Sequence, residues 1–235
     1  MDMRTHAYDQ RRHEIETYFD RTAAQAWARL TSDAPVGRIR ASVRAGRDRM
    51  RATLLSWLPS DLRGARVLDA GCGTGAAAVA LAQRGAEVVA VDLSPTLVQL
   101  ARERLPADLG PGRVEFRSGD MLEQALGPFD HVFAMDSLIH YDAEDAARTL
   151  ARLAERTLGS MVFTFAPRTP ALAAMHAVGR LFPRGDRAPA IVPVAETRLN
   201  DLIAAEPALQ GWRRQSSVRI AHGFYTSQAQ HWRQV

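Results

Sequence analysis

Short apolar runs alternate with longer amphipathic segments through the middle of the chain. The apolar runs are rich in valine and phenylalanine, and they predict strands at 66–68, 87–92, 113–118, 130–136 and 161–166. The segments between them predict helices at 76–83, 95–105 and 142–158. Strands and helices in alternation indicate an α/β fold with a doubly wound, mostly parallel sheet. Residues 216–220 and 223–227 predict a closing antiparallel strand pair.

Residues 1–64 precede this pattern and are predicted to form a helical arm on a core that spans residues 65–235. Helices are expected at 13–20, at 22–30 and, after a proline, at 35–58. The last helix carries an apolar stripe of Ile39, Val43, Met50 and Leu54. Beside it lies a row of four arginines, Arg40, Arg44, Arg47 and Arg51. This arginine row is either a solvated face or a contact for substrate carboxylates, acidic lipid or a partner protein.

Composition and charge narrow the class of protein and its partners. With 46% apolar residues and no apolar run of the roughly 18 residues that a bilayer requires, the chain is expected to be soluble. Its one cysteine, Cys72, excludes a disulfide framework and favours the cytoplasm, with peripheral contact at the inner membrane left open. The net charge is +4, and the chain has 30 arginines and no lysine. No basic block suggests nucleic acid, so an anionic small molecule or an acidic membrane surface is the expected target.

The stretch 66–75 carries the most specific chemistry of the chain. A short strand runs into Asp69 and then into three alternate glycines, ahead of an alanine-rich helix. Glycines allow a tight turn and close approach to a ligand, which also meets the positive end of the helix. Gly71, Gly73 and Ala76 also fit the dinucleotide pattern G-x-G-x-x-G/A, so a nicotinamide or flavin enzyme is an alternative. Asp69 argues against it, because a carboxylate there repels a pyrophosphate but accepts a hydrogen bond from an ammonium group.

Three acids follow successive predicted strands and fit S-adenosylmethionine, a cofactor that joins an amino-acid head to adenosine. Asp69 is expected to receive the ammonium group, Asp92 the ribose hydroxyls and Asp120 the adenine amino group. An acid followed by G-x-G-x-G also resembles the first motif of the class I methyltransferases. Cys72 is interpreted as a small residue that fills the turn rather than as a reactive thiol. The predicted cofactor-binding residues are Asp69, Gly71, Cys72, Gly73, Thr74, Gly75, Asp92, Leu93, Asp120, Met121, Met135 and Asp136.

Residues 167–195 are predicted to form an insertion after the fifth strand that acts as a lid over the substrate. The insertion contains an apolar, helix-like segment at 171–182, followed by a basic, turn-rich segment at 183–189. A lid of this composition suits a large apolar substrate with anionic edges. An ordinary surface helix with a polar loop is the alternative interpretation.

Blocks of sequence outside the cofactor motif are similar to the magnesium-protoporphyrin IX methyltransferases. The blocks are 17–22, 27–29, 46–48, 136–141, 163–168, 181–184 and 223–225. The resemblance implies a seven-stranded class I methyltransferase that transfers a methyl group from S-adenosylmethionine to one propionate of magnesium-protoporphyrin IX, in bacteriochlorophyll and chlorophyll synthesis. It also implies that the porphyrin-binding subunit of magnesium chelatase delivers the substrate. The magnesium belongs to the substrate, because no residues here have the spacing of a protein metal site.

This reaction needs positioning more than a strong base, because a propionate is already ionised near neutral pH. His140 is the first catalytic candidate. It would orient the carboxylate or accept a proton, unless it only caps the next helix. Tyr18 is the second, as a hydroxyl donor that closes over cofactor and substrate, unless it only packs the arm onto the core. The predicted substrate-binding residues are arginines of the shared blocks, Arg47, Arg168 and Arg184.

Three other functions stay open on the sequence alone. A nicotinamide oxidoreductase is disfavoured by Asp69 and by the acid after the third strand. A non-catalytic protein of the same fold that carries porphyrin between enzymes would bind porphyrin without turnover. A methyltransferase of another small carboxylic acid or of an amine is the alternative within the transferase class.

Overall fold

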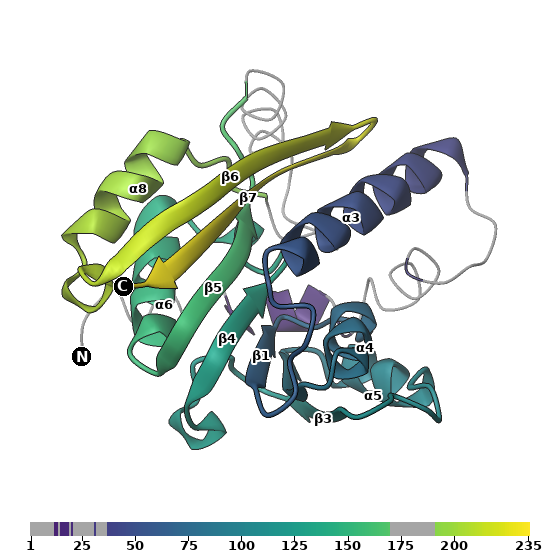
Figure 1. Cartoon of the computed structure of the whole chain (residues 1–235). Coiled ribbons are helices and arrows are strands. Elements are labelled where there is room, and N and C mark those ends of the chain that lie inside the picture. The colour runs from purple at the N-terminus through teal and green to yellow at the C-terminus, as the bar shows by residue number, and fades with distance from the viewer. Residues whose placement is uncertain (1–11, 14, 19, 21–30, 32–36, 170–190) are drawn as a thin grey trace.

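The computed structural model describes residues 12–13, 15–18, 20, 31, 37–169 and 191–235, which build one sheet with helices on both faces (Figure 1). The strands are β1 Arg66–Ala70, β2 Glu87–Asp92, β3 Arg113–Ser118, β4 Phe129–Ala134, β5 Thr157–Phe165, β6 Trp212–His222 and β7 Tyr225–Gln234. The α-helices are α3 Arg38–Ser56, α4 Ala76–Gln83, α5 Pro95–Glu103, α6 Ala143–Ala154 and α8 Glu196–Ala205. No helix in the described ranges is both long and apolar enough to span a bilayer.

The sheet has the strand order β3-β2-β1-β4-β5-β7-β6. The first five strands run parallel, and β7 lies antiparallel between β5 and β6. Asp69 of β1 is in register with Ala90 of β2 and Phe133 of β4. The carboxyl ends of these three strands therefore meet at one edge, at the point where the strand order reverses, which is where open α/β sheets bind ligands. The predicted doubly wound sheet with a closing antiparallel pair is confirmed.

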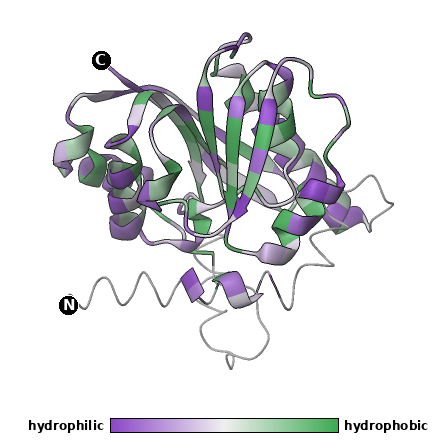
Figure 2. Cartoon of the chain, turned by 90° about the horizontal axis from the view of Figure 1, so that it is seen from below, coloured by the Kyte–Doolittle hydropathy of each residue, from purple (hydrophilic) through white to green (hydrophobic). Residues whose placement is uncertain are grey.

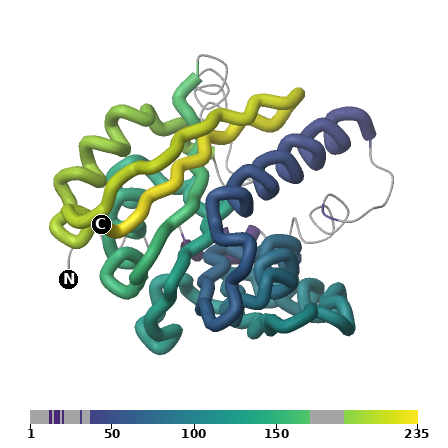
Figure 3. The backbone as a smooth tube through the Cα atoms, in the orientation of Figure 1, coloured from purple at the N-terminus to yellow at the C-terminus, as the bar shows by residue number. Residues whose placement is uncertain are grey.

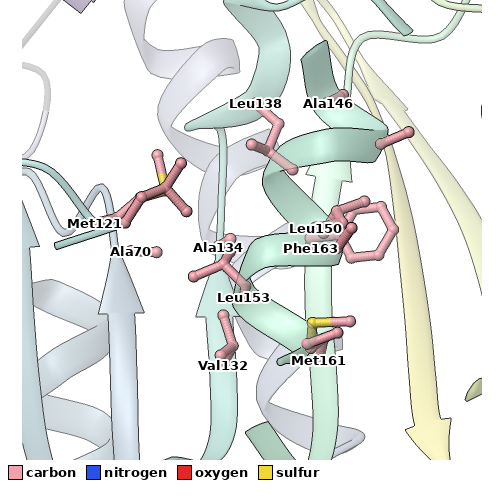
Figure 4. Close-up of a cluster of buried hydrophobic side chains, with 14 of the residues drawn as sticks. Ala70, Met121, Val132, Ala134, Leu138, Ala146, Leu150, Leu153, Met161 and Phe163 are labelled. Atoms are coloured by element: carbon pink, nitrogen blue, oxygen red, sulfur yellow. The ribbon is translucent and has the colours of Figure 1, made fainter. Parts of the chain in front are cut away.

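The side chains of the strands pack into two separate apolar layers. On one face, Val132 of β4 and Phe163 of β5 pack with Leu150 of α6 (Figure 4), and α8 extends this layer. On the other face, Val67 and Phe133 pack with buried residues of α3, α4 and α5. The strands carry hydrophobic residues through the interior, while the helices turn hydrophilic residues outward (Figure 2). Burial on both faces explains why the central strands read as continuous apolar runs.

Two predicted helix starts are confirmed by their capping hydrogen bonds. Ser94 Oγ accepts from Leu97 N at 3.2 Å, and Pro95 opens the first turn of α5. Asp142 Oδ1 accepts from Asp145 N at 2.8 Å and caps α6. Both helices therefore begin where short polar side chains satisfy backbone donors that have no partner within the helix.

Several predicted boundaries were wrong. α6 ends at Ala154 instead of near residue 158, because Thr157 begins β5 and its hydroxyl donates to Leu153 O at 2.6 Å. The closing strands are longer than predicted, since their outer ends are polar and carry little apolar signal. α8 was not predicted, and only Leu199 and Ile203 of this helix are buried. Ile39 does not continue the apolar stripe of α3; it lies in the first turn and is 58% exposed.

The helix α3 lies along the β6–β7 hairpin (Figure 3), although it belongs to the predicted N-terminal arm. Its Met50 and Leu54 are fully buried in the layer that includes β1 and β7. Gly46 makes the approach possible, because a Cβ at this position would lie 2.7 Å from the Cβ of Tyr225. A glycine at the crossing therefore sets how closely α3 approaches the sheet.

Replacing Gly46 by alanine is expected to lower the melting temperature. Overpacking costs about 1–3 kcal/mol, which exceeds the roughly 1 kcal/mol that alanine gains over glycine in a helix. Differential scanning calorimetry measures the change. Gly211→Ala is the matched control, because a Cβ at Gly211 would meet no atom within 4 Å. If Gly46→Ala melts at the wild-type temperature, the contact with Tyr225 does not hold α3 in place.

Candidate active site

A cavity of about 530 Å³ lies at the carboxyl edge of β1, β2 and β4. Its lining includes most of the glycine turn that follows β1, the end of β2, one side of α3, the segment 135–141 after β4, and the N-terminal arm through Ile15 and Tyr18. Ile191, at the far end of the predicted insertion, also lines it. Residues far apart in the sequence therefore share one cavity.

The glycine turn is folded back onto the end of β2. Gly71 N and Cys72 N both donate to Val91 O, at 2.8 and 3.0 Å. Gly71 has a φ of +81°, and a Cβ there would lie 2.5 Å from the Cβ of Ser137. Only glycine combines this left-handed backbone with such a close approach. The turn thus brings β1 and the segment after β4 together around the cavity.

Asp69 is a buried carboxylate that lacks part of its hydrogen bonding. The residue is 2% exposed, and its Oδ2 has no hydrogen-bond partner among the residues that the structure describes. Burial, with the nearby charge of Asp92 as a second cause, raises the pKa of Asp69 to about 7. A buried acceptor without a partner is costly unless a ligand supplies the donor. Asp69 therefore fits a ligand that brings a cationic N–H group, as predicted for the ammonium group of S-adenosylmethionine.

Asp92 fixes the glycine turn and still faces the cavity. Its Oδ2 accepts from Gly73 N at 2.8 Å, and its Oδ1 accepts from Ser94 N at 3.0 Å. Burial raises the pKa of Asp92, although these two backbone donors act in the opposite direction. Leu93 lines the cavity beside it. Because each carboxylate oxygen has two lone pairs, the site remains compatible with the predicted contacts to ribose hydroxyls.

The free energy of unfolding of the ligand-free protein is expected to fall as the pH rises from about 4 to about 7. Asp69 has a folded pKa of about 7 against its usual 3.8, so in this window the folded state holds a proton that the unfolded state releases. Asp92, whose pKa is also raised, acts in the same direction. Urea denaturation at about pH 5 and about pH 8 measures the change. Asp69→Asn should flatten the profile, and a variant profile equal to the wild type would contradict this origin.

The loop after β3 combines the predicted Asp120 and Met121 with a residue that sequence reasoning missed. Met121 is buried and lines the cavity, together with Gly119. Asp120 is not part of the lining; its Oδ2 accepts from Arg12 Nη1 at 3.0 Å. Arg156, between α6 and β5, donates to Glu123 O at 2.5 Å and also to Met121 O. An arginine far along the chain thus holds the loop, and only the folded topology reveals it.

The two catalytic candidates, His140 and Tyr18, lie on the same cavity. His140 is 7% exposed and ends a 3₁₀ turn, Leu138–His140. It does not cap the following helix, since Asp142 does so. Tyr18 is partly buried and reaches the cavity from the arm. The structure therefore brings both residues to the edge where the glycine turn lies, and their catalytic roles remain predictions.

All four members of the arginine row line the cavity, so the row is not simply a solvated face. Arg47 Nη1 donates to Asp136, which also accepts from Tyr225 Oη at 3.0 Å. Arg51 Nη2 donates to Asp48 Oδ1 at 2.8 Å. The sequence left open whether the row is a solvated face or a contact, and its place in the cavity lining favours a contact with a ligand. Tyr225 belongs to the shared block 223–225, and its contact with Asp136 follows only from the strand order.

The ends of the predicted insertion are described, but most of it is not. Arg168 is exposed and does not line the cavity. Its backbone N donates to Val194 O at 2.8 Å, and Val192 N donates to Ile139 O at 2.9 Å. These bonds bring the far end of the insertion beside the segment of His140. Arg184 and the predicted lid segments 171–182 and 183–189 lie outside the described residues.

The cavity combines an anionic part and a cationic part. The glycine turn presents the carboxylates of Asp69 and Asp92, and α3 presents its arginine row. A ligand with a cationic group and a ligand with carboxylates can therefore be held in one cavity. Among the residues that the structure describes, no three side chains of His, Cys, Asp or Glu gather as a metal site requires.

Comparison with known proteins gives consistent results over the whole chain. A family described as magnesium-protoporphyrin IX methyltransferase C-terminus matches residues 134–234, and one described as methyltransferase domain matches residues 67–158. The magnesium-protoporphyrin O-methyltransferase of Rhodobacter capsulatus is 49% identical over 232 residues, which cover 96% of this chain and 98% of the relative. The protein of the same name from Synechocystis is 33% identical over 171 residues, covering 72% of this chain and 74% of the relative.

A solved structure extends the similarity to the fold. The crystal structure of magnesium protoporphyrin IX methyltransferase from Synechocystis PCC 6803 with bound SAH has a TM-score of 0.83 and 27% identity, and it covers 96% of this chain and 100% of that chain. The predicted class I methyltransferase fold is therefore confirmed. With nearly full coverage by a relative that is 49% identical, this chain belongs to the magnesium-protoporphyrin O-methyltransferase family.

Proposed function

We propose that this chain transfers a methyl group from S-adenosylmethionine to one propionate carboxylate of magnesium-protoporphyrin IX and forms the monomethyl ester. The observation that carries the proposal is one cavity in which a buried, incompletely bonded Asp69 shares the lining with the arginine row and His140. The names of the relatives, and the SAH bound in the Synechocystis structure, support the same reaction. S-adenosylmethionine, when bound, supplies an electrophilic methyl group on a sulfonium centre.

Residues at the glycine turn are proposed to hold the cofactor. Asp69 accepts from the ammonium group, and the energy gained offsets the cost of burying its charge. Asp92 accepts from ribose hydroxyls while it keeps the turn closed through Gly73. Met121 covers the adenine ring, and Arg156 holds the loop that carries it. Gly71 and Gly73 let the backbone approach the ligand without Cβ clashes, and Cys72, Thr74 and Met135 line the cavity beside them, whereas Gly75 does not.

The chain's main task in the reaction is to align a nucleophile that already exists. A propionate has a carboxyl pKa of roughly 4, so it is ionised near neutral pH. Alignment of two reactants can lower a barrier by about 7–11 kcal/mol. We assign the alignment to Arg47 on α3, which binds the carboxylate, and to His140, which orients it or accepts its proton when burial has kept the acid neutral. Tyr18 contributes a hydroxyl donor from the arm.

Two finer proposals concern delivery of the substrate. The porphyrin-binding subunit of magnesium chelatase is proposed to pass porphyrin to this chain, and the inner membrane is proposed to be a peripheral contact. The net charge of +4 and two exposed apolar side chains, Ile39 and Phe224, support a surface contact of this kind. Both residues contact Ser42, which donates to Ile39 O and accepts from Phe224 N.

Vesicle sedimentation with anionic lipid tests the membrane contact, and equal sedimentation with neutral lipid would exclude charge attraction. A pull-down with the chelatase subunit tests delivery.

The reaction is tested with labelled S-adenosylmethionine and magnesium-protoporphyrin IX, by following the label into an ester by chromatography. One methyl per porphyrin, in an ester that base hydrolyses, is the expected result. Cofactor binding without ester would keep the cofactor assignment and direct the search to other acids. Porphyrin binding without any turnover would favour a carrier. Failure to bind S-adenosylmethionine would favour a dinucleotide as the ligand of the glycine turn.

A further inference from the structure

Asp136 is a buried carboxylate held by four side chains from three elements, α3, β5 and β7. Its side chain is 5% exposed. Its Oδ2 accepts from Arg47 Nη1 of α3, and its Oδ1 accepts from Tyr225 Oη of β7 at 3.0 Å. Thr164 of β5 donates to the same oxygen at 3.2 Å, and Ser227 of β7 donates to it at 3.4 Å. The carboxylate therefore joins α3 to the carboxyl edge of the sheet.

The backbone of Asp136 is also unusual. With a φ of 56°, it is the described non-glycine residue that adopts a left-handed conformation. Asp136 N donates to Thr164 Oγ1 at 2.7 Å, which fixes the turn after β4. Such a conformation persists only where surrounding contacts determine it, and it occurs often at functional sites. Here the turn places the carboxylate against Arg47, while the adjacent Met135 and Ser137 line the cavity.

We infer that Asp136 is a positioning residue that holds Arg47 at the cavity wall and offsets its charge, so that Arg47 orients a substrate carboxylate without binding it too strongly. The inference rests on the proposed function. It assigns the side chain of Asp136 to the substrate half of the cavity, whereas the sequence assigned the residue to the cofactor.

The reason lies in how charge changes during the reaction. As a carboxylate oxygen attacks the sulfonium methyl, the negative charge of the carboxylate falls. A cation with no counterion would therefore stabilise the ionised substrate more than the transition state, which raises affinity and lowers turnover. The ion pair of Arg47 and Asp136 has no net charge. The guanidinium carries five N–H donors in a planar fork, and this geometry is compatible with a second contact, to a ligand. The pair can thus orient the nucleophile and leave it reactive.

Tyr225 supports the pair from the sheet side. Burial, and then the negative charge of Asp136, raises the pKa of Tyr225 far above its usual value, so the phenol stays a donor at every physiological pH. The same side chain packs on Gly46, next to Arg47 in α3. One tyrosine therefore fixes both the carboxylate and the helix that carries the arginine.

Asp136→Asn tests the inference, because asparagine has the same shape, tolerates a left-handed backbone and removes the charge. Quenching of porphyrin fluorescence measures affinity for magnesium-protoporphyrin IX, and the ester assay measures kcat. We expect binding about tenfold tighter and kcat at least about tenfold lower, the factor that corresponds to 1.4 kcal/mol. SAH affinity should stay at the wild-type value. Weaker porphyrin binding, an unchanged kcat or a loss of SAH affinity would each overturn the inference.

Two further variants keep the test decisive. Asp61→Asn removes an exposed carboxylate that pairs with Arg63 in a loop outside the cavity, and it should leave kcat and porphyrin affinity unchanged. If Asp136→Asn does not fold, Tyr225→Phe loosens the carboxylate but keeps its charge, so kcat should fall while porphyrin affinity stays constant. A Tyr225→Phe protein with wild-type kcat would overturn the inference. If the wild type binds porphyrin but makes no ester, the proposed function fails, while the affinity change in Asp136→Asn still tests the charge balance.

Discussion

Asp69→Asn is expected to lose cofactor affinity and, at the same time, to melt at a higher temperature without ligand. Both effects have one cause. In the ligand-free protein the carboxylate is buried and its Oδ2 has no partner in the described part of the chain, so an ionised Asp69 destabilises the fold. Asparagine keeps the shape and removes the charge, which relieves that cost. The same change removes the anion that an ammonium group requires, and loss of one partner in a buried charge pair costs about 2–5 kcal/mol.

Isothermal titration calorimetry with SAH and thermal denaturation near pH 8 measure the two effects. Asp130→Asn is the control: Asp130 lies at the amino end of β4 and accepts from Arg66 N at 2.7 Å, far from the glycine turn. It should keep wild-type SAH affinity. An Asp69→Asn protein that binds SAH as tightly as the wild type would remove Asp69 from cofactor recognition. If Asp69→Asn instead melts below the wild type, other groups of the folded protein compensate the buried charge of Asp69.

His140→Ala is expected to lower kcat by about 10²–10⁴-fold, the contribution typical of a positioned acid–base group, while SAH affinity stays unchanged. His140 is buried in the cavity wall after β4, and the capping of α6 by Asp142 leaves it no role as a helix cap. Single-turnover measurements with labelled cofactor separate the chemical step from product release. A kcat equal to the wild type would exclude His140 from the mechanism.

Two variants separate the possible roles of His140. If the imidazole orients the carboxylate by a hydrogen bond, His140→Gln should restore part of the rate lost in His140→Ala, because an amide can also donate. If it accepts a proton, His140→Gln should be as slow as His140→Ala, and the acid limb of the pH–rate profile should disappear. Tyr18→Phe offers a comparison from the arm; a wild-type rate would leave Tyr18 with a packing role.

Local chemistry explains which parts of the fold the sequence predicted correctly. The glycine turn, the Ser94 cap and the Asp142 cap depend on residues a few positions apart, and each is present where it was expected. The strand order typical of α/β folds predicted that Asp69 and Asp92 lie together at the carboxyl edge of the sheet, and both line one cavity. These features need no knowledge of distant contacts.

The features that the sequence missed or left open depend on contacts between distant segments. The arginine row of α3 faces a cavity, whereas its period alone left open whether it meets solvent or a ligand. The sequence did not identify the partners of Asp136, because Arg47 and Tyr225 come from opposite ends of the sequence. The α8 helix has only two buried residues, so its apolar signal was too weak to predict it. Packing, rather than local propensity, decides each of these cases.

The approach of α3 to the β6–β7 hairpin has a consequence for the order of folding. Ser42 and Phe224 are 182 positions apart in the sequence, whereas Gly73 and Asp92 are 19 apart. The entropy cost of closing a chain segment grows with its length, so contacts between distant residues form after local ones. The glycine turn can therefore close on β2 while α3 is still detached. We therefore expect a refolding chain to regain the cofactor half of its site first and to pack the arginine row of α3 over the cavity last.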